Sequence, residues 1–414
     1  MEGKGLIKEK CIAGKEYQIC LECKEQSAWI ENGYFGEISI EKSALFCAKV
    51  KNIDTGEYKN IYSDSAWENV RVNRHGDTIK LYFTNPEGIS KLLFVVSGIY
   101  DEVGISWSVE VINDNCKWSV IEVNYPIPLL RASYFDLFVP DGSGIVIENA
   151  GKNGYSSQHR YPGGFICMQY YAVYGKNSGI YIGVEDGEGA VKNFKASAGD
   201  EQAVIEATFY GINSSAPANS FSLGGHIRWQ FIEGDWYDAT MLYADFVRTK
   251  ANWMPHIEQD GRTDTPERFK NVPFWVSDYI PNSPSQGNNK PMKLSAGSDL
   301  YDKNYWVDAV IELQEKLQVP IAYHVYNWHK IPFNIEYPHF LPAKEDFIEG
   351  AKKLREHPIY ILPYINAGSW EMHDAEMGHE INFENTGKRG AIIQENGDFD
   401  IEIYPQKTLK GVLL

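Results

Sequence analysis

Residues 321–329 (IAYHVYNWH) constrain the fold of this chain more than any other stretch. They begin as the near-continuous apolar run of a strand that is covered on both faces, and they end in polar and aromatic residues. Similar apolar runs lie at residues 273–278 and 359–366, and residues 306–317 and 342–354 have the apolar periodicity of helices. Strands that alternate with helices predict a parallel sheet of the kind that opens a (β/α)8 barrel.

The length of this region limits how much of a barrel it can form. A complete barrel needs about 200–250 residues, and about 140 residues follow Val272. We therefore expect residues 272–414 to form the first part of an α/β TIM barrel, with about three βα units. Residues 279–290 are predicted to be one of the long βα loops that build an active-site wall.

The first 233 residues predict an antiparallel β-sandwich. Short segments rich in Val, Ile, Tyr, Phe and Trp are separated by turn signals. In residues 105–111 (ISWSVEV) every second residue is apolar, which is typical of a strand with one dry and one wet face. Residues 155–164 are predicted to be a polar loop. The candidate strands are residues 16–24, 36–48, 77–84, 91–100, 104–111, 118–123, 165–174, 179–184, 203–210 and 220–231.

A change of period marks the end of the sandwich. In residues 236–247 apolar residues recur at intervals of three and four, which predicts a helix, and Asp235 is placed to cap it. The polar residues 254–268 are predicted to be a linker. The sequence therefore predicts a multidomain protein with a sandwich in residues 1–233, a connecting helix and linker in residues 234–271, and the barrel segment in residues 272–414.

The charge of the chain disfavours two classes of partner. The chain has 39 basic and 56 acidic residues, with a formal net charge of −17. An acidic surface repels phosphate backbones and anionic membranes, and the sequence has no basic stripe interleaved with aromatic residues. No apolar run reaches the length of a transmembrane helix. We expect neither nucleic acid nor a membrane as partner.

The N-terminal residues and the cysteines favour a cytoplasmic location. Residues 1–10 lack the apolar core of a secretory signal. Six cysteines are scattered over the first 167 residues, unlike the dense disulfide framework of a small secreted domain. A reducing cytoplasm is the simplest setting for them.

No cofactor and no metal site is predicted. Residues 373–380 bring together five potential metal ligands, but they do not form a His-Glu-x-x-His motif. On a helix His373 and His379 would not share a face. A solvated loop is the prediction for this segment.

Six short motifs resemble those of a bacterial family of glycosidase-like proteins. The motifs are YPGG at 161–164, MQY at 168–170, GIYIGV at 179–184, GDWYDA at 234–239, FWVSD at 274–278 and HVYNWH at 324–329. Members of that family have a galactose-mutarotase-like β-supersandwich followed by a glycosidase-type barrel. They are similar to endo-α-N-acetylgalactosaminidases and, more distantly, to α-galactosidases. The resemblance covers the chain to about residue 395.

The resemblance implies a glycan substrate and hydrolysis of an O-glycosidic bond by two carboxylates. In such enzymes the nucleophile usually follows the fourth barrel strand and the acid follows the sixth. Only three barrel strands are identifiable here, so the catalytic pair is expected beyond the end of this chain and no catalytic residue is assigned. The alternative is a non-catalytic carbohydrate-binding or structural fragment. With either function, the unpaired edges of the incomplete sheet predict a chain that self-associates or is partly disordered after residue 272.

Residues at the predicted strand ends are candidates for the first part of a substrate cleft. Asp278 could hold sugar hydroxyls by charge-assisted hydrogen bonds, or it could bind the adjacent loop. His324 could contact a sugar or be a hydrogen-bonded core residue. Trp328 could offer its face to a pyranose ring or close the mouth of the barrel.

The other candidates follow the second and third predicted strands. Asn327, His329 and Asn366 are predicted to contact substrate, because three polar residues at two neighbouring strand ends need a reason. Trp370 and Glu371 are further candidates. Glu371 could be taken for a general acid or base, although its place at the third strand argues against that role.

Overall fold

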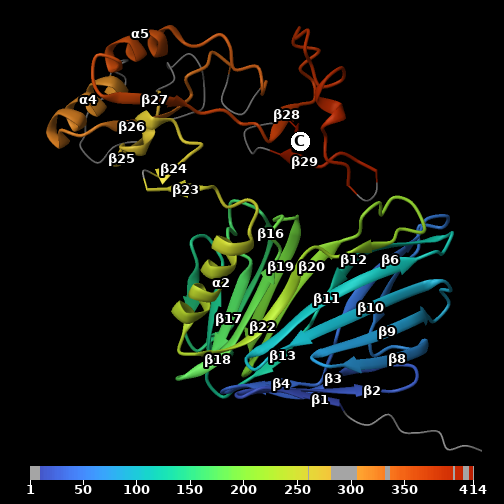
Figure 1. The fold of residues 1–414 in the computed structure, drawn as a ribbon. Coiled ribbons are helices and arrows are strands. Elements are labelled where there is room, and N and C mark those ends of the chain that lie inside the picture. The colour runs from blue at the N-terminus through green and yellow to red at the C-terminus, as the bar shows by residue number, and fades with distance from the viewer. Residues whose placement is uncertain are drawn as a thin grey trace, which may run out of the picture. The chain divides into compact units, whose positions relative to one another are not determined.

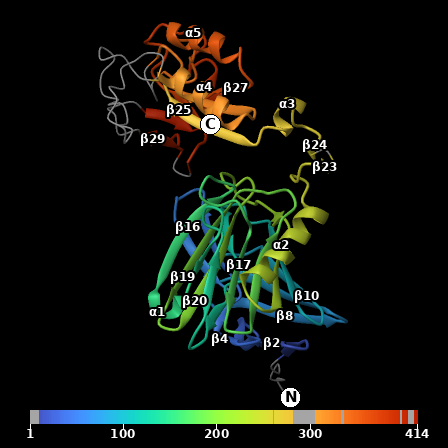
Figure 2. The same ribbon diagram turned by 90° about the vertical axis from the view of Figure 1, so that its left-hand side faces the viewer.

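The structure is a computed structural model that describes residues 10–259, 261–280, 305–331, 336–394, 397–403 and 410–413. The chain divides into two compact units, Met1–Met254 and Pro255–Leu414, and each is described by itself (Figures 1 and 2). In the part of the chain that the structure describes, no helix combines the length and apolar character needed to cross a membrane.

Unit 1 is a β-sandwich of two antiparallel sheets. The larger sheet has the order β1 (Lys10–Ala13), β2 (Tyr17–Cys23), β3 (Ala28–Phe35), β4 (Ile38–Glu41), β13 (Leu129–Arg131), β20 (Gln202–Tyr210), β12 (Trp118–Asn124), β6 (Cys47–Asn52) and β7 (Tyr58–Tyr62). Three strands lie off this path: β5 (Ser43–Ala44) pairs with β3, and β16 (Tyr155–Tyr161) pairs with β19 (Lys192–Gly199), which pairs with β20.

The smaller sheet of unit 1 has ten strands. Its order is β15 (Ile145–Ile147), β14 (Asp136–Val139), β17 (Tyr170–Tyr174), β18 (Ser178–Glu185), β22 (His226–Glu233), β11 (Gly104–Asn113), β10 (Leu92–Tyr100), β9 (Thr78–Pro86) and β8 (Trp67–His75), with β21 (Phe221–Ser222) paired to β11. The short helix α1 (Ala150–Asn153) lies between β15 and β16 in the chain.

Alternating apolar residues of both sheets form one core between them. In β11 the buried side chains are those that the period-two pattern places on one face, including Trp107. The Trp107 ring packs edge-on against Trp229 of β22, with 5.7 Å between ring centroids. Each such buried tryptophan removes about 150–250 Å² from water, roughly 4–6 kcal/mol at about 25 cal/mol per Å². The predicted antiparallel sandwich is confirmed.

Three details of unit 1 differ from the predictions. The predicted polar loop at 155–164 contains β16, whose side chains alternate between half-buried and exposed, so the strand lacks an apolar signal. The predicted strand at 36–48 is divided among β4, β5 and the start of β6. A disulfide joins Cys11 and Cys20, which are directly opposed on β1 and β2. The scatter of the cysteines gave no sign of this bond.

A buried lysine fixes the turn between β18 and β19. Lys192 Nζ donates hydrogen bonds to Asp186 Oδ2 (2.8 Å), Gln169 Oε1 (2.8 Å) and the Ala190 carbonyl (2.5 Å). Burial alone would raise the pKa of Asp186, but Lys192 and the amides of Glu188 and Ala190 outweigh it and hold this pKa below its usual range. The pair is therefore an ionised contact inside the sandwich.

Helix α2 (Trp236–Lys250) belongs to unit 1 and covers the outer face of the ten-stranded sheet. It begins as predicted, because the Asp235 side chain accepts a hydrogen bond from the Tyr237 amide in a capping box. Its buried face packs against tyrosines that point outward from β17 and β18, and the Tyr243 and Tyr170 rings stack 4.8 Å apart. Figure 2 shows the helix lying alongside these strands.

Unit 2 is built on a parallel sheet of three strands. These are β25 (Phe274–Tyr279), β26 (Ile321–Tyr326) and β27 (Ile359–Pro363), in that order. Helices α4 (Tyr305–Leu317) and α5 (Glu345–Leu354) connect them and pack with one face of the sheet in a common core (Figure 1). The predicted succession of strands and helices is confirmed. Within the described residues the sheet stays open and does not close into a barrel.

Shorter elements complete unit 2. They are the hairpin β23 (Ile257–Glu258) and β24 (Gly261–Arg262), the helix α3 (Glu267–Lys270), the 3-10 turn η2 (Gly387–Arg389), and an antiparallel sheet with the order β28 (Ser369–Glu371), β30 (Lys410–Leu413) and β29 (Ile401–Ile403).

Two predicted boundaries in unit 2 are wrong. Helix α5 begins at Glu345 and not at Pro342, because Lys344 is still in an extended conformation. Strand β27 ends at Pro363 and not at residue 366, because proline lacks a backbone donor for the sheet. Trp370 and Glu371 belong to β28 in the antiparallel sheet and not to the parallel sheet. The predicted βα loop at 279–290 lies outside the described residues from residue 281 onward.

Candidate functional site

Three tyrosines occupy equivalent positions at the carboxyl ends of the parallel strands. Tyr279 and Tyr326 are register partners on β25 and β26, and Tyr364 directly follows β27. The ring centroids of Tyr279 and Tyr326 lie 4.7 Å apart, and those of Tyr326 and Tyr364 lie 4.3 Å apart. We call these three residues the tyrosine row. It lies at the edge of the sheet where barrel enzymes hold their substrates.

His324 lies on the same face, two residues before Tyr326 on β26. Its ring centroid is 4.7 Å from that of Tyr326 and 5.9 Å from that of Tyr364. The side chain is half-buried. Among the predicted site residues, His324 is the one that the structure places against the tyrosine row.

Aromatic residues also line the amino end of this face. Phe269 of α3 packs against Trp275 of β25 and Tyr360 of β27, with ring centroids 6.1 and 5.5 Å apart. These two residues are register partners of the fully buried Ala322 on the central strand. The face therefore presents an aromatic surface at one end and phenol and imidazole groups at the other.

Asp278 lies on the opposite face of the sheet from the tyrosine row. Strand alternation places it with Val276 and Val325, whose side chains belong to the core under α4 and α5. Its Oδ1 accepts a hydrogen bond from the Tyr279 amide at 2.7 Å. Burial raises the pKa of Asp278. The geometry supports the loop-binding alternative for this residue.

Asn327 joins the ends of two strands. It is 3% exposed, and its Nδ2 donates a hydrogen bond to the Ile280 carbonyl at 2.8 Å. Its own carbonyl accepts one from Lys344 Nζ at 2.8 Å, and burial lowers the pKa of Lys344 to about 8. The φ of Asn327 is +57°, a left-handed conformation that Asn tolerates better than most residues.

This left-handed residue turns the following side chains into the core. Trp328 is 7% exposed, packs against Phe340 and Phe347, and donates a hydrogen bond from Nε1 to the Tyr364 carbonyl at 2.7 Å. His329 is fully buried, and its Nδ1 donates to the Ile331 carbonyl at 2.7 Å. Burial lowers the pKa of His329, so the ring is neutral at pH 7. Neither ring presents a face to solvent.

The remaining predicted residues lie after β27. Asn366 is half-buried, and its Oδ1 accepts a hydrogen bond from the Gly368 amide at 2.8 Å. Glu371 is 4% exposed, and its Oε1 accepts one from the His373 amide at 3.1 Å. Burial raises the pKa of Glu371. The Glu371 amide donates to the Tyr337 carbonyl at 2.9 Å, which attaches β28 to the segment after β26.

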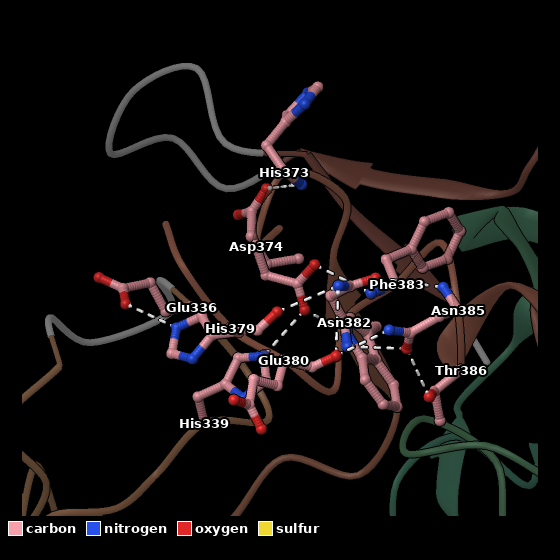
Figure 3. Close-up of polar contacts among 12 residues, drawn as sticks. Glu336, His339, His373, Asp374, His379, Glu380, Asn382, Phe383, Asn385 and Thr386 are labelled. Carbon is pink, nitrogen blue, oxygen red and sulfur yellow. Dashed lines mark hydrogen bonds and ion pairs between the residues drawn. The ribbon is translucent and has the colours of Figure 1, made fainter. Parts of the chain in front are cut away.

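A buried carboxylate organises the segment that was predicted to be a solvated loop (Figure 3). Asp374 is fully buried. Its Oδ2 accepts hydrogen bonds from His339 Nε2 (2.8 Å) and Trp370 Nε1 (2.7 Å), and its Oδ1 accepts one from the Phe383 amide (2.9 Å). Burial alone would raise the pKa of Asp374, but these three donors outweigh it and lower the pKa.

Two histidines stack beside this carboxylate. The His339 and His379 rings are nearly parallel, with centroids 3.6 Å apart, and His379 Nε2 donates a hydrogen bond to Glu336 Oε2 at 3.2 Å. We call Glu336, His339, Asp374 and His379 the loop clamp. Together they tie the segment after β26 to the segment after β27.

Sequence reasoning missed both the tyrosine row and the loop clamp. A signal for the row was present, because each of the three predicted strands has a tyrosine at or just after its end. The clamp has no such signal, since its members come from separate segments. Within the described ranges, no group of three or more His, Cys, Asp or Glu side chains is arranged to hold a metal ion.

The sequence matches one family profile and is similar to two curated proteins. Residues 221–412 match the sequence profile of a domain of unknown function, DUF6259. The chain is 23% identical over 247 residues to "Putative glycoside hydrolase 22789" of Monosiga brevicollis. This alignment covers 55% of this chain and 20% of that protein. The chain is also 22% identical over 298 residues to "Putative glycoside hydrolase" of Bacteroides thetaiotaomicron. This alignment covers 71% of this chain and 40% of that protein.

The fold is similar to that of a solved glycosidase. The structure of the α-N-acetylgalactosaminidase NagBb from Bifidobacterium bifidum in complex with GalNAc aligns with a TM-score of 0.67 at 11% identity, over 98% of this chain and 65% of that chain. The ligand-free form of the same enzyme aligns with a TM-score of 0.64. This protein is therefore similar to glycoside hydrolases in sequence and in fold. It spans 20% and 40% of the length of the two curated relatives.

Proposed function

We propose that this protein is a glycoside hydrolase-like protein that binds a glycan at the carboxyl ends of its parallel strands. The observation that carries the proposal is the tyrosine row with His324 beneath it. Phenol rings offer an apolar surface and a polar hydroxyl, which suits the mixed surface of a sugar. Tyr279 is 45% exposed, so part of this surface faces solvent.

The loop clamp supports the same site by fixing its surroundings. It joins the segments that follow β26 and β27 through the buried Asp374. A binding surface needs side chains that are held in place by a second layer of contacts. We propose that the clamp supplies that layer by holding together the two segments that follow Tyr326 and Tyr364.

For the chemistry of the whole enzyme, we propose hydrolysis of an O-glycosidic bond in a complete (β/α)8 barrel, of which β25–β27 are the first strands. Such hydrolysis needs two carboxylates on either side of the bond. Among the described residues that end the three strands, Asp278 is the one carboxylate, and it faces the helices. We therefore assign the catalytic pair to sequence outside these 414 residues, which agrees with the partial coverage of the relatives.

The second candidate function is carbohydrate binding without catalysis. The observation that favours it is the position of Asp278 and Glu371. Burial raises the pKa of each, and each carboxylate accepts a hydrogen bond from a neighbouring backbone amide. Both side chains thus have structural partners. Asp278 lies on the face opposite the tyrosine row, and Glu371 lies within β28.

The experiment combines binding and turnover on the full chain. Binding of galactose and N-acetylgalactosamine is measured by saturation-transfer NMR, and turnover is measured with aryl α- and β-glycosides of both sugars. We expect the saturation-transfer signal to decrease in Tyr326→Ala, and no turnover. Tyr82→Ala is the matched control, because Tyr82 of β9 in unit 1 is half-buried like Tyr326.

The outcomes separate the two candidates. Turnover by this chain would contradict the assignment of the catalytic pair to other sequence, and Glu371 and Asp278 would be the first residues to substitute. Binding that is unchanged in both Tyr326→Ala and His324→Ala would contradict the role of the tyrosine row. Turnover only in a longer chain that extends over the aligned relatives would support the hydrolase.

A further inference from the structure

A cavity of about 330 Å³ opens on the outer face of the twelve-stranded sheet, within unit 1. Its lining residues come mainly from the adjacent strands β7, β6, β12 and β20 and alternate there with residues of the sandwich core. Cys47 is the register partner of both Tyr62 and Asn124, and Lys49 is that of Glu122. The volume is at the lower end of small-molecule sites, which suits one ring-shaped molecule better than a polymer.

The charges of the cavity balance one another. Glu122 and Glu206 contribute two carboxylates, Lys49 contributes an ammonium group, and Lys195 Nζ lies 2.8 Å from Glu206 Oε2. A neutral ligand fits this balance better than an ion. Carboxylates accept hydrogen bonds and ammonium groups donate them, so the lining complements several hydroxyl groups on one molecule.

One buried acceptor indicates that the ligand brings a donor. Asn124 Oδ1 is buried and has no hydrogen-bond partner among the residues that the structure describes. An unsatisfied buried acceptor is costly, and a ligand hydroxyl would satisfy it once the Asn124 amide rotates toward the cavity that this residue lines. Tyr62, which is 42% exposed, adds an aromatic surface at the same cavity.

We propose that this cavity binds a single neutral sugar unit. Asn124, Glu122 and Glu206 accept hydrogen bonds from its hydroxyl groups, Lys49 donates to its oxygens, and Tyr62 contacts the ring. The site shares no residue with the tyrosine row and lies in the other unit. It therefore stands independently of the function proposed for the parallel sheet.

Cys47 lies in the lining and reports on occupancy. The full chain is treated with iodoacetamide in the absence and presence of galactose, N-acetylgalactosamine or glucose, and alkylation of each free cysteine is followed by mass spectrometry. Burial raises the pKa of the Cys47 thiol, so the reaction is run at about pH 9, where more thiolate forms. For a Kd of about 1 mM, about 10 mM sugar slows alkylation of Cys47 about tenfold. The exposed Cys116 and Cys167 are unaffected and serve as internal controls.

Substitutions decide whether the cavity is responsible. Glu122→Gln keeps the shape and removes one charge, and Tyr62→Ala removes the ring; both abolish the slowing of Cys47 alkylation by sugar. Tyr34→Ala retains it, because Tyr34 of β3 has the same 42% exposure and does not line the cavity. Tyr326→Ala retains it as well, which separates this site from the tyrosine row.

Three results would overturn the proposal. The first is that none of the sugars changes the alkylation rate of Cys47. The second is that the polyamine spermidine protects Cys47 and the sugars do not, which would make the cavity a cation site. The third is protection by sugar that persists in both Glu122→Gln and Tyr62→Ala, when circular dichroism shows that the variants are folded.

Discussion

Removal of the Asp374 carboxylate tests the role of the loop clamp. In Asp374→Ala three donors lose their acceptor: His339 Nε2, Trp370 Nε1 and the Phe383 amide. Each hydrogen bond to a charged group is worth about 1.5–3 kcal/mol. Water can reach His339, whose side chain is 15% exposed, so the three losses do not add in full. We expect the segment to lose about 3–5 kcal/mol of stability, the range for breaking a buried charged pair.

Hydrogen exchange of the full chain measures this loss locally. The informative amides are those of Phe383, Glu371 and Met377, which are hydrogen-bonded within or next to the clamp. A loss of 3–5 kcal/mol corresponds to exchange that is about 10² to 4 × 10³ times faster, at tenfold per 1.4 kcal/mol. Asp374→Asn keeps one acceptor and should show an intermediate change.

The control is Asp264→Asn, which makes the same chemical change at an exposed ion pair of unit 2 and should leave these amides unchanged. The contribution of Asp374 also depends on pH. Because folding lowers its pKa, its contribution is complete above the unfolded value of about 3.9 and is lost as the pH falls through the folded value. Unchanged exchange of Phe383 and Glu371 in Asp374→Ala would refute the clamp, and so would equal acceleration throughout β25–β27.

Three further predictions concern single side chains. Lys192→Met leaves Asp186 buried without its cation and should lower the unfolding free energy of unit 1 by about 3–5 kcal/mol in urea titrations, whereas Lys15→Met at an exposed ion pair should leave the midpoint in place. Folding raises the pKa of Glu371 above its unfolded value of about 4.3, so the natural chain loses stability as the pH rises above that value and Glu371 must ionise in a buried place. Glu371→Gln has no such loss, and its stability relative to the natural chain should increase with pH. A difference in stability that is independent of pH would contradict this. Asp235→Ala removes the capping box of α2 and should cost about 1 kcal/mol by thermal unfolding, with Asp235→Ser restoring most of it.

The sequence predicted elements well where one face is buried and poorly where it is not. The strict alternation of β11 revealed its buried face, and the apolar run of β26 revealed a strand covered by helices. Strand β16 escaped notice because its first six side chains alternate between half-buried and exposed positions and only its last residue, Tyr161, is buried. Its strand conformation comes from pairing with β19, which is a long-range contact that local composition does not encode.

The site illustrates the same limit at the level of side chains. The ends of β25 and β26 were predicted to within one residue, but which way the following side chains point depends on backbone conformation. The left-handed φ of Asn327 turns Trp328 and His329 into the core, away from the face where a sugar contact was expected. The buried Asp374 accepts a hydrogen bond from His339, which lies 35 residues away in sequence. Such partners cannot be read from local spacing.

The position of β22 has a consequence for how this chain can be divided. The domain profile begins at residue 221, yet β22 is an inner strand of the ten-stranded sheet, between β18 and β11, and α2 covers that sheet. A fragment that starts at residue 221 would therefore carry a strand with two open edges and a helix whose aromatic face has lost its tyrosines. The domain profile, which begins at residue 221, and the compact unit 1, which ends at Met254, therefore have different borders. Gene fusions or exchanges that preserve both units would have to join after α2, near Met254.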